Sequence, residues 1–417
     1  MAFDFLMSRK REGPLRSNVI MIGQPQSQQS RVDSDRHRCI RSMRIVQFVT
    51  NLDIGGAERL AVDLAECQLA DGHQPFIYCL THGGRLAEEA AAKGVCVRTF
   101  GKAGGPHPST VWKIARQLRR DRPDVLHTHN HLVHHYGVAA AVLARVPVVV
   151  NTRHRAEFHF VNNPQGSRIS PVAKDRKSDL IFRLTLPWVG SVVMISEATR
   201  RFFVQYRSIP EAKTRVILNG SRLGKFLSAR AYPGSALPRI RFGVAARLVP
   251  EKDHFTLLRA FKAVCAAIPE AELQIAGDGP LRSRLEEFAA ELDLAKNIKF
   301  LGALGDTSQF LSQLDIFVLS SLNEGMPLSV LEAMAAALPI VSTRAGGVAE
   351  AAIGGQNAYF AEVGDAAGLA EAMIRMARSP DLARMGALGP QIVQERFRIE
   401  ETWRNYYELF RSLGARN

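Results

Sequence analysis

The sequence predicts an α/β protein with two doubly wound parallel sheets, and three observations support this fold class. Short apolar runs rich in β-branched residues alternate with amphipathic stretches from Met43 onward, as in βα units on a parallel sheet. The series breaks once, at residues 226–239, where FLSARAYPGSALPR has the composition of a linker. The length of 417 residues suits two domains that each bury their own core.

The first domain is expected over residues 43–225. Its predicted strands are Arg44–Thr50, Phe76–Leu80, Val95–Phe100, Val125–Thr128, Val148–Asn151, Val192–Ile195 and Val216–Leu218. The polar, basic residues 1–42 are expected to form a disordered extension, since they lack the apolar core and cleavage site of a secretory signal. An incorrectly assigned start codon is the alternative, because Met43 begins a clean first strand.

The second domain is expected over residues 240–399. Its predicted strands are Phe242–Ala246, Leu273–Ala276, Ile298–Leu301, Ile316–Leu319, Ile340–Thr343 and Ala358–Ala361. The last residues, 400–417, contain an amphipathic helix that carries Trp403 and Tyr406. Ligands of open parallel sheets bind at the carboxyl ends of the strands, so the functional residues are sought in the loops there.

The formal net charge of +14 comes from the first half of the chain. Residues 1–230 carry 35 lysines and arginines against 18 acidic residues, whereas residues 231–417 carry 19 against 22. A basic surface suits nucleic acid, an anionic membrane or a phosphorylated substrate. The basic runs lack interleaved aromatic residues, which argues against nucleic acid.

The cysteines and the hydropathy pattern bear on where the protein works. The five cysteines are widely spaced and form no Cys-x-x-Cys pair, so we interpret them as reduced core thiols of a cytoplasmic protein. No stretch approaches the roughly 18 apolar residues that a membrane span needs.

Two glutamates with seven residues between them form the strongest local signal, Glu324 and Glu332 in SSLNEGMPLSVLEAMAAA. If this segment were fully helical, the carboxylates would lie about 12 Å apart along the axis, about the span from a sugar to a ribose across a diphosphate. The helix start near Leu328 and Ser329 would present free N–H groups to the phosphates. Glu332 lies in an otherwise apolar helix and should have a partner or a ligand. The alternative is a pair of solvated glutamates.

Further loops suit phosphate binding. Arg247 and Lys252 in ARLVPEKDH follow the first strand of the second domain and could clamp a diphosphate, or they are ordinary surface charges. Gly55 and Gly56 follow the first strand and open a helix, so the backbone there could approach a phosphate closely. The alternating histidines of HTHNH, from His127, suggest a metal site only weakly, because no acidic residue or cysteine completes a ligand set.

The segment EGMPLSVLEAMAAALPIVSTRAGG closely resembles the Glu-x7-Glu motif of glycosyltransferase family 4, the retaining GT-B enzymes, and the likeness covers about residues 43–413. It implies two Rossmann-like domains that face each other across a cleft, with residues 400–417 packing back on the first. It also implies sugar transfer from a nucleotide-diphosphate sugar, with Glu324 contacting the sugar and Glu332 the ribose. Arg247 and Lys252 are then expected to bind the diphosphate.

The resemblance further places His129 near the donor sugar and the developing charge, while His127 is interpreted as a satisfied strand residue. The expected catalytic residues are thus His129, Glu324, Arg247 and Lys252. The expected donor-binding residues are Gly55, Gly56, Gly277, Gly325, Met326, Pro327, Leu328, Ser329 and Glu332. Family enzymes work without a divalent cation, so no metal and no cofactor is expected.

The acceptor is expected to be lipid-linked or a saccharide, in polysaccharide or glycoconjugate biosynthesis. The basic stretch from Arg153 to Arg183 is either a dock for the anionic inner face of the plasma membrane or a mobile solvated loop. No nucleic-acid partner is expected. The alternatives are a non-catalytic sugar-nucleotide or glycan-binding protein, a nucleotide-sugar epimerase or phosphorylase on the same fold, and a nucleic-acid-binding protein.

Overall fold

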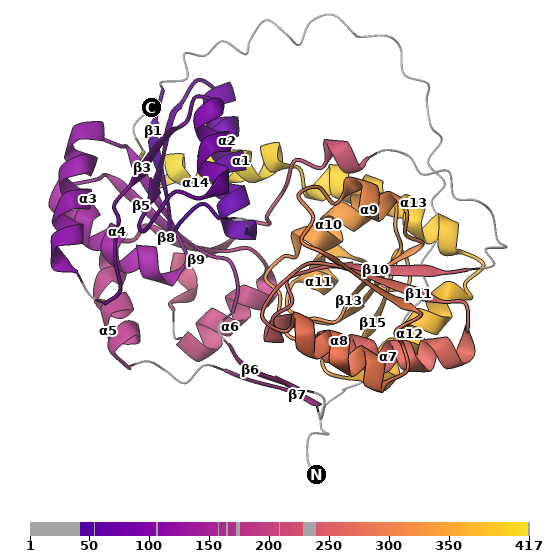
Figure 1. Ribbon diagram of the computed structural model, residues 1–417. Coiled ribbons are helices and arrows are strands. Elements are labelled where there is room, and N and C mark those ends of the chain that lie inside the picture. The colour runs from indigo at the N-terminus through magenta and orange to yellow at the C-terminus, as the bar shows by residue number, and fades with distance from the viewer. Residues whose placement is uncertain are drawn as a thin grey trace, which may run out of the picture. The chain divides into compact units, whose positions relative to one another are not determined.

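The computed structural model describes residues 42–53, 55–105, 107–156, 158–163, 166–171, 176–207, 209–227 and 239–415 (Figure 1). Residues 1–41 of the predicted extension and 228–238 of the predicted linker lie outside this part. Between residues 157 and 179 the structure describes only the backbone of these segments. Of the predicted membrane-docking stretch, the side chains of Arg168, Lys174, Arg176 and Lys177 therefore lie outside the described part.

The first sheet has seven parallel strands in the order β3-β2-β1-β4-β5-β8-β9. Its strands are β1 Arg44–Val49, β2 Gln74–Cys79, β3 Cys96–Thr99, β4 Val125–His129, β5 Val148–Arg153, β8 Ser191–Met194 and β9 Thr214–Val216. The strand order reverses between β1 and β4, which makes the sheet doubly wound and brings the loops after these two strands to one switch point.

Two helical layers cover the first sheet. The helices are α1 Gly56–Ala70, α2 Arg85–Ala92, α3 Pro108–Asp121, α4 His131–Ala144, α5 Arg176–Thr185 and α6 Glu197–Arg207, with short 3-10 turns at Leu186–Trp188, Glu211–Lys213 and Gly224–Phe226. Ile114 of α3, Val133 of α4 and Phe203 of α6 share one core with the sheet. Leu60 and Leu64 of α1 belong to a core on the opposite face.

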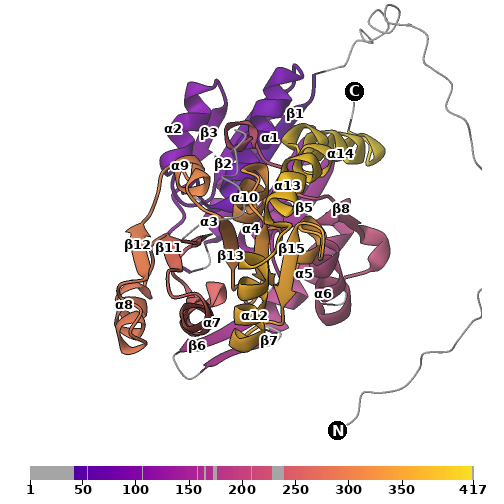
Figure 2. The same ribbon diagram turned by 90° about the vertical axis from the view of Figure 1, so that its right-hand side faces the viewer.

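The second sheet has six parallel strands in the order β12-β11-β10-β13-β14-β15. Its strands are β10 Arg241–Ala245, β11 Glu272–Ala276, β12 Ile298–Gly302, β13 Ile316–Leu319, β14 Ile340–Thr343 and β15 Ala358–Ala361. The helices are α7 His254–Ala267, α8 Arg282–Glu291, α9 Ser308–Ser312, α10 Leu328–Ala335, α11 Val348–Ala351, α12 Ala366–Ala377 and α13 Leu382–Arg396, and Pro250–Lys252 forms a 3-10 turn. Helices α7, α8 and α12 lie on one face and α9, α10 and α13 on the other (Figure 2).

The last helix, α14 Ile399–Ser412, belongs to the core of the first sheet. Trp403, Tyr406 and Phe410 are buried there beside Ile45 and Leu64. Trp403 Nε1 donates a hydrogen bond to Asp71 Oδ2 over 2.6 Å, and Tyr406 Oη lies 2.8 Å from Thr152 Oγ1. The chain thus returns to its first sheet after completing the second.

The α/β fold class with two parallel sheets is confirmed, and each predicted strand is present. The strand predicted at Val216–Leu218 begins earlier, at Thr214, because its register is set by pairing with β8. The antiparallel hairpin of β6 Phe158–Asn163 and β7 Gly166–Pro171 was not predicted. Its strands form a separate two-stranded sheet, and their sequences, FHFVNN and GSRISP, are not the apolar runs by which the other strands were predicted.

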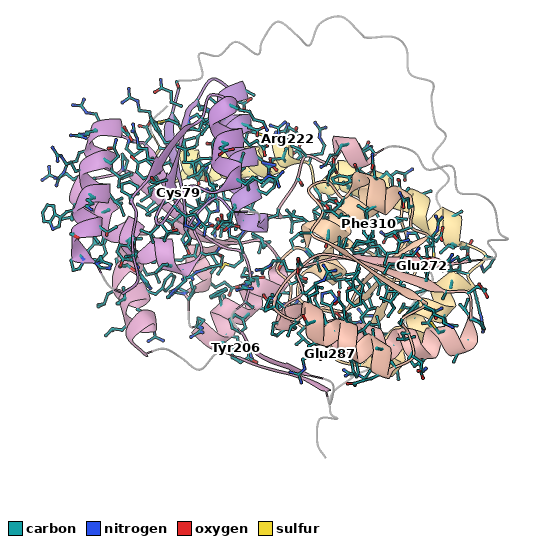
Figure 3. All side chains as sticks on the ribbon, in the orientation of Figure 1. Cys79, Tyr206, Arg222, Glu272, Glu287 and Phe310 are labelled. Carbon is teal, nitrogen blue, oxygen red and sulfur yellow. The ribbon has the colours of Figure 1, made fainter. Side chains whose placement is uncertain are left out.

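The cysteines divide between the core and the surface. Cys67 and Cys79 are buried free thiols, and Figure 3 shows Cys79 inside the first sheet's unit. Burial raises the pKa of Cys79 to about 12. Cys96 is exposed, which corrects the prediction that all cysteines are core thiols: it lies on the edge strand β3, whose outer side no strand covers. Cys39 lies outside the described residues.

Candidate active site

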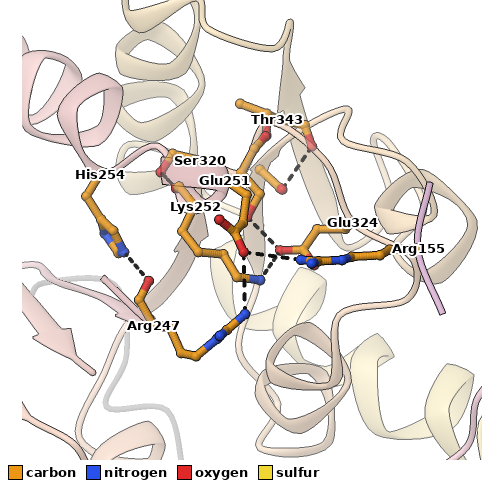
Figure 4. A network of polar contacts seen from close by, with 10 residues as sticks. Arg155, Arg247, Glu251, Lys252, His254, Ser320, Glu324 and Thr343 are labelled. Atoms are coloured by element: carbon orange, nitrogen blue, oxygen red, sulfur yellow. Dashed lines mark hydrogen bonds and ion pairs between the residues drawn. The ribbon is translucent and has the colours of Figure 1, made fainter. Parts of the chain in front are cut away.

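The loop after β10 carries Arg247 and Lys252, and its backbone is held from several sides. Leu248 N donates to the carbonyl of Asp278 over 2.9 Å, and Ser320 Oγ donates to the carbonyl of Lys252, also over 2.9 Å. His254 Nε2 donates to the carbonyl of Arg247 over 3.1 Å, as Figure 4 shows. Both cations therefore project from a fixed backbone at the carboxyl end of the second sheet.

Gly277 is required for this arrangement. Its φ of +151° lies in a region that L-residues rarely adopt, and a Cβ there would lie 1.9 Å from the carbonyl oxygen of Ala246. Gly277 therefore packs its backbone directly against the loop that bears Arg247. This contact helps to position the loop.

Lys252 and Glu324 form a partly buried ion pair. Lys252 Nζ lies 2.5 Å from Glu324 Oε1, and Ser321 Oγ donates to the same oxygen over 2.6 Å (Figure 4). The two side chains are 17% and 9% exposed, so the charge pair is largely shielded from water. The Thr343 hydroxyl donates to the Ser321 carbonyl and fixes the strand end from which Ser321 projects.

Arg247 is much more exposed, and it shares a carboxylate with an arginine from the first sheet. Glu251 Oε1 accepts from Arg247 Nη2 over 3.4 Å and pairs with Arg155 Nη1 over 3.2 Å (Figure 4). Arg155 follows the end of β5, so both sheets supply cations to this place. Sequence reasoning missed Glu251 and Arg155. The position of Glu251 between Arg247 and Lys252 was the available signal.

Glu332 lies on α10 and is half-buried. Its Oε2 accepts a hydrogen bond of 3.0 Å from Thr307 Oγ1, which supplies the partner that the sequence required. Burial raises the pKa of Glu332 above its ordinary value. The Thr307 hydroxyl thus occupies one of the two carboxylate oxygens.

Helix α10 begins at Leu328 rather than directly after Glu324 and ends at Ala335. The segment between the two glutamates is thus only partly helical, and the 12 Å estimate for a full helix does not apply to it. Pro327 at the N-cap offers no side-chain hydrogen bond, which leaves the first N–H groups of α10 for a ligand. Gly56 faces this helix start, since a Cβ there would meet Leu328 Cδ1 at 3.8 Å.

Gly325 is where the Glu324 loop meets the first sheet. A Cβ on Gly325 would lie 1.9 Å from the carbonyl oxygen of His154 and 2.7 Å from Ile195 Cδ1, so only glycine fits. Met326 is buried beside it in the second core, and Ser329 is half-buried on α10. A second contact joins the helices of the two sheets. The Glu350 carboxylate of α11 accepts hydrogen bonds from the N–H groups of Glu197 and Ala198, each over 2.8 Å, and so caps α6.

His129 ends β4 and is 1% exposed. Its Nε2 lies 2.8 Å from Gln47 Oε1, and its Nδ1 lies 2.9 Å from His154 Nε2. Burial, together with the neighbouring His127 and His154, holds the pKa of His129 well below its ordinary value. His129 is therefore neutral: Nε2–H donates to Gln47, and Nδ1 accepts from His154.

The imidazoles around His129 are neutral as well. Burial lowers the pKa of His127 and of His154 to about 3. His127 Nε2 lies 2.7 Å from Thr152 Oγ1, as expected for a satisfied strand residue. Sequence reasoning missed His154 and Gln47, although Gln47 is a polar residue on a buried strand and so carried a signal.

Gly55 and Gly56 open α1, whose N-terminus has no side-chain cap. The Glu58 carboxylate folds back over Gly55, since a Cβ on that glycine would clash with Glu58 Oε2. Burial raises the pKa of Glu58, while the charges of Arg247 and Arg155 act in the opposite direction. The start of α1 therefore lies in the electrostatic field of the same cations.

The structure brings Arg247, Lys252 and Glu324 together at the carboxyl end of the second sheet, and it joins His129 to His154 at the end of the first. Within the described ranges, no group of three histidine, cysteine or acidic side chains is arranged to hold a metal ion. In the same ranges no helix is both long and apolar enough for a membrane span. The individual roles of the predicted residues remain predictions.

Comparisons with known proteins show the family of the chain. The family Glycosyltransferase Family 4 matches residues 54–223, and the family Glycosyl transferases group 1 matches residues 230–387. The chain is 32% identical over 379 residues to the lipopolysaccharide core biosynthesis glycosyltransferase LpsE of Rhizobium meliloti, covering 89% of this chain and 99% of that protein.

Two further proteins are similar. A UDP-Gal:alpha-D-GlcNAc-diphosphoundecaprenol alpha-1,3-galactosyltransferase of Escherichia coli is 28% identical over 252 residues, covering 56% of this chain and 61% of that one. The crystal structure of Anabaena Alr3699/HepE in complex with UDP-glucose has a TM-score of 0.71 at 21% identity, covering 89% and 100% of the two chains. Alignments with the curated relatives span from 58% to 99% of those proteins.

Proposed function

The chain belongs to glycosyltransferase family 4, the glycosyl transferases of group 1, and on this premise we propose that it moves a sugar from a uridine-diphosphate sugar to a lipid-linked acceptor with retention of configuration. One observation supports the proposal most directly. Arg247 and the Lys252–Glu324 pair adjoin a helix start without a side-chain cap, and Glu332 projects from that helix. Such a site matches a molecule with a sugar, a diphosphate and a ribose.

Each part of the donor then has a protein group of suitable chemistry. Arg247 and Lys252 bind the diphosphate as cations, and the free N–H groups at Leu328 and Ser329 add hydrogen bonds. The ionised Glu324 accepts hydrogen bonds from sugar hydroxyls, and Glu332 accepts them from the ribose. Gly325 lets the Glu324 loop approach the first sheet closely.

The reaction requires stabilisation of a leaving group. The bond between the anomeric carbon and the phosphate oxygen breaks, and its electron pair leaves with the diphosphate. The acceptor hydroxyl oxygen bonds to the same carbon on the same face, and its proton passes to the departing phosphate oxygen. Lys252 and Arg247 offset the negative charge that develops on the phosphate, which is the largest contribution that such a site makes.

His129 acts in this proposal as a neutral group. Its pKa is too low for it to carry charge near neutral pH, and Gln47 and His154 already occupy both ring nitrogens. We therefore propose that His129 positions His154 beside the donor sugar through their hydrogen bond. His154 is half-buried and its carbonyl lies against the Gly325 backbone, which supports this role.

The nucleotide and acceptor are drawn from the names of similar proteins. One related structure contains UDP-glucose, and one relative is named for galactose transfer to a lipid diphosphate. LpsE is named for lipopolysaccharide core biosynthesis. An acceptor of this kind places the enzyme at the inner face of the plasma membrane, in glycoconjugate biosynthesis.

Thermal shift with purified protein tests the donor site. The melting temperature is compared with and without UDP, GDP, ADP and their sugar conjugates, in the presence and absence of EDTA, alongside Glu332→Ala and Arg247→Ala. We expect EDTA-insensitive stabilisation by UDP compounds that both variants lose. Transfer of radiolabelled sugar to a lipid-diphosphate acceptor then tests the reaction. Stabilisation without any transfer would favour a sugar-nucleotide-binding protein instead.

A further inference from the structure

Exposed apolar side chains gather on the helices of one face of the first sheet. Of the eleven large apolar side chains exposed in the described part of the chain, eight lie on α3, α4, α5 and the turn that follows α5, so their distribution is not random. These helices are neighbours, since α4 packs against both α3 and α5. We call these side chains the outer face: Trp112, Leu132, Val142, Leu143, Leu180, Ile181, Leu184 and Trp188.

Helix α4 differs most clearly from an ordinary surface helix. It has no charged residue, and its inner side already fills the core with Val133 and Val138. A surface helix normally turns polar residues to water, whereas α4 presents Leu132, Val142 and Leu143. An outward apolar stripe of this kind marks a surface that binds another apolar phase.

Cations surround the outer face. The exposed cations are Lys113, Arg116, Arg119, Arg120, Arg122, Arg145 and Arg183. Trp112, Arg116 and Arg119 follow one another at helical spacing along the same side of α3. Arg119 Nη2 donates to the Leu143 carbonyl over 2.8 Å, which joins the basic side of α3 to the apolar end of α4.

No acidic residue is exposed among the described side chains of α3, α4 and α5. Between His107 and Arg153 the sequence contains two acids, Asp121 and Asp124. Asp121 is buried beneath Arg98, and Asp124 accepts a hydrogen bond from the Arg44 backbone, so neither balances the exposed cations. The surface combines apolar anchors with uncompensated positive charge.

We infer that the outer face docks the enzyme on an anionic lipid bilayer, with the apolar side chains in the interface and the cations at the headgroups. The two exposed tryptophans, Trp112 and Trp188, suit the headgroup level. A second copy of the chain fits less well, because a two-fold contact would bring the cations against one another. Nucleic acid would use the cations but not the exposed leucines.

The position of the surface connects it to the site. Helix α4 begins at His131, two residues after His129, so its exposed Leu132 lies at the site's end of the helix. A bilayer against the outer face would hold a lipid-linked acceptor near that end. The inference deepens the proposed function by naming the membrane as a partner, and it can be tested without any transfer.

Vesicle sedimentation with the full chain tests the inference. The partition coefficient is measured for vesicles of phosphatidylcholine alone and of phosphatidylcholine mixed with phosphatidylglycerol. We expect binding only to the mixed vesicles, weakened by salt. The pair Leu184→Glu and Trp188→Glu should reduce it at least about ten-fold, because each change removes an exposed apolar side chain that the bilayer would bury. Arg116→Glu should reduce it about five-fold or more.

Matched controls lie on the second sheet's unit, where Leu301 and Leu304 are exposed and Lys296 is an exposed cation. Leu301→Glu with Leu304→Glu, and Lys296→Glu, should leave vesicle binding unchanged. Equal losses in outer-face and control variants, or equal binding to uncharged vesicles, would overturn the inference. So would a dimer in light scattering that only the outer-face variants dissociate, or RNA binding that exceeds vesicle binding. Donor stabilisation by UDP is measured in the same variants and separates this outcome from failure of the proposed function.

Discussion

The polar side chains at the carboxyl ends of the two sheets differ in charge. At the first sheet, His127, His129 and His154 are buried against one another and stay neutral. At the second, Lys252 and Glu324 are partly buried and form an ion pair. Burial alone removes a charge when no opposite charge is in reach, whereas a partner retains it. The same fold thus supplies a neutral hydrogen-bonding half and an ionic half to one site.

The sharpest test of the ionic half is Lys252→Ala. It removes the cation from the Glu324 pair and from the proposed diphosphate, so kcat should fall by about 10²–10³-fold. Steady-state kinetics measures this, and Lys262→Ala is the matched control because Lys262 is exposed and only loosely paired with Asp293. A normal kcat in Lys252→Ala would show that the ionic half does not stabilise the leaving group.

Gly325→Ala tests whether the two halves must touch. The new methyl group would collide with the His154 carbonyl, so the Glu324 loop must move away from the first sheet. Activity should fall about 10²-fold, since a displacement of about 1 Å at a site costs that much. Gly224→Ala is the control, because no atom lies near its added Cβ. Full activity in Gly325→Ala would mean that the contact is dispensable.

Acid should lower the free energy of unfolding, because His127 and His154 are neutral in the folded protein. The folded-state pKa of His127 and His154 is about 3, below the value of about 6.5 in an unfolded chain, so the unfolded state binds more protons between these values. The free energy of unfolding should therefore fall as pH drops from about 6.5 toward 3, by up to about 1.4 kcal/mol per pH unit for each histidine. Asp63, whose pKa burial raises to about 6, opposes this trend.

Urea unfolding at a series of pH values measures the slope. His154→Gln keeps a hydrogen-bond donor toward His129 and removes one titrating group, so its slope should be shallower than that of the wild type. A slope that stays the same in the variant, or a stability independent of pH, would contradict the neutral assignment of these imidazoles.

The smallest expected effect concerns Glu251, which holds Arg155 and Arg247 at the surface of the ionic half. Glu251→Gln removes an anion that competes with the donor phosphates, so UDP should bind about two- to five-fold more tightly, as suits exposed ion pairs. Calorimetric titration with UDP measures this. Glu362→Gln, which alters an exposed pair with Arg344, should change nothing. Weaker binding in Glu251→Gln would assign Glu251 a contact with the donor itself.

The sequence predicted the architecture well because its signals are local. The strands of both sheets are buried apolar runs between turns. Arg247 and Lys252 stand in one short motif, and Glu324 and Glu332 stand in another. The missed residues depend on contacts between distant segments. Arg155 and Glu251 are 96 residues apart, and Gln47 meets His129 across 82 residues, so no local pattern indicates either contact. The hairpin of β6 and β7 was missed because it pairs outside both sheets.

The return of α14 to the first sheet has a consequence for biosynthesis. Ile399, Trp403, Tyr406 and Phe410 belong to the same core as Ile45 and Leu64, although the whole second sheet lies between them in the chain. At about 5–20 residues per second, the first sheet waits many seconds for the helix that covers it. During that time a nascent chain exposes an apolar face that chaperones recognise, and a truncated transcript yields a protein that cannot complete its first core.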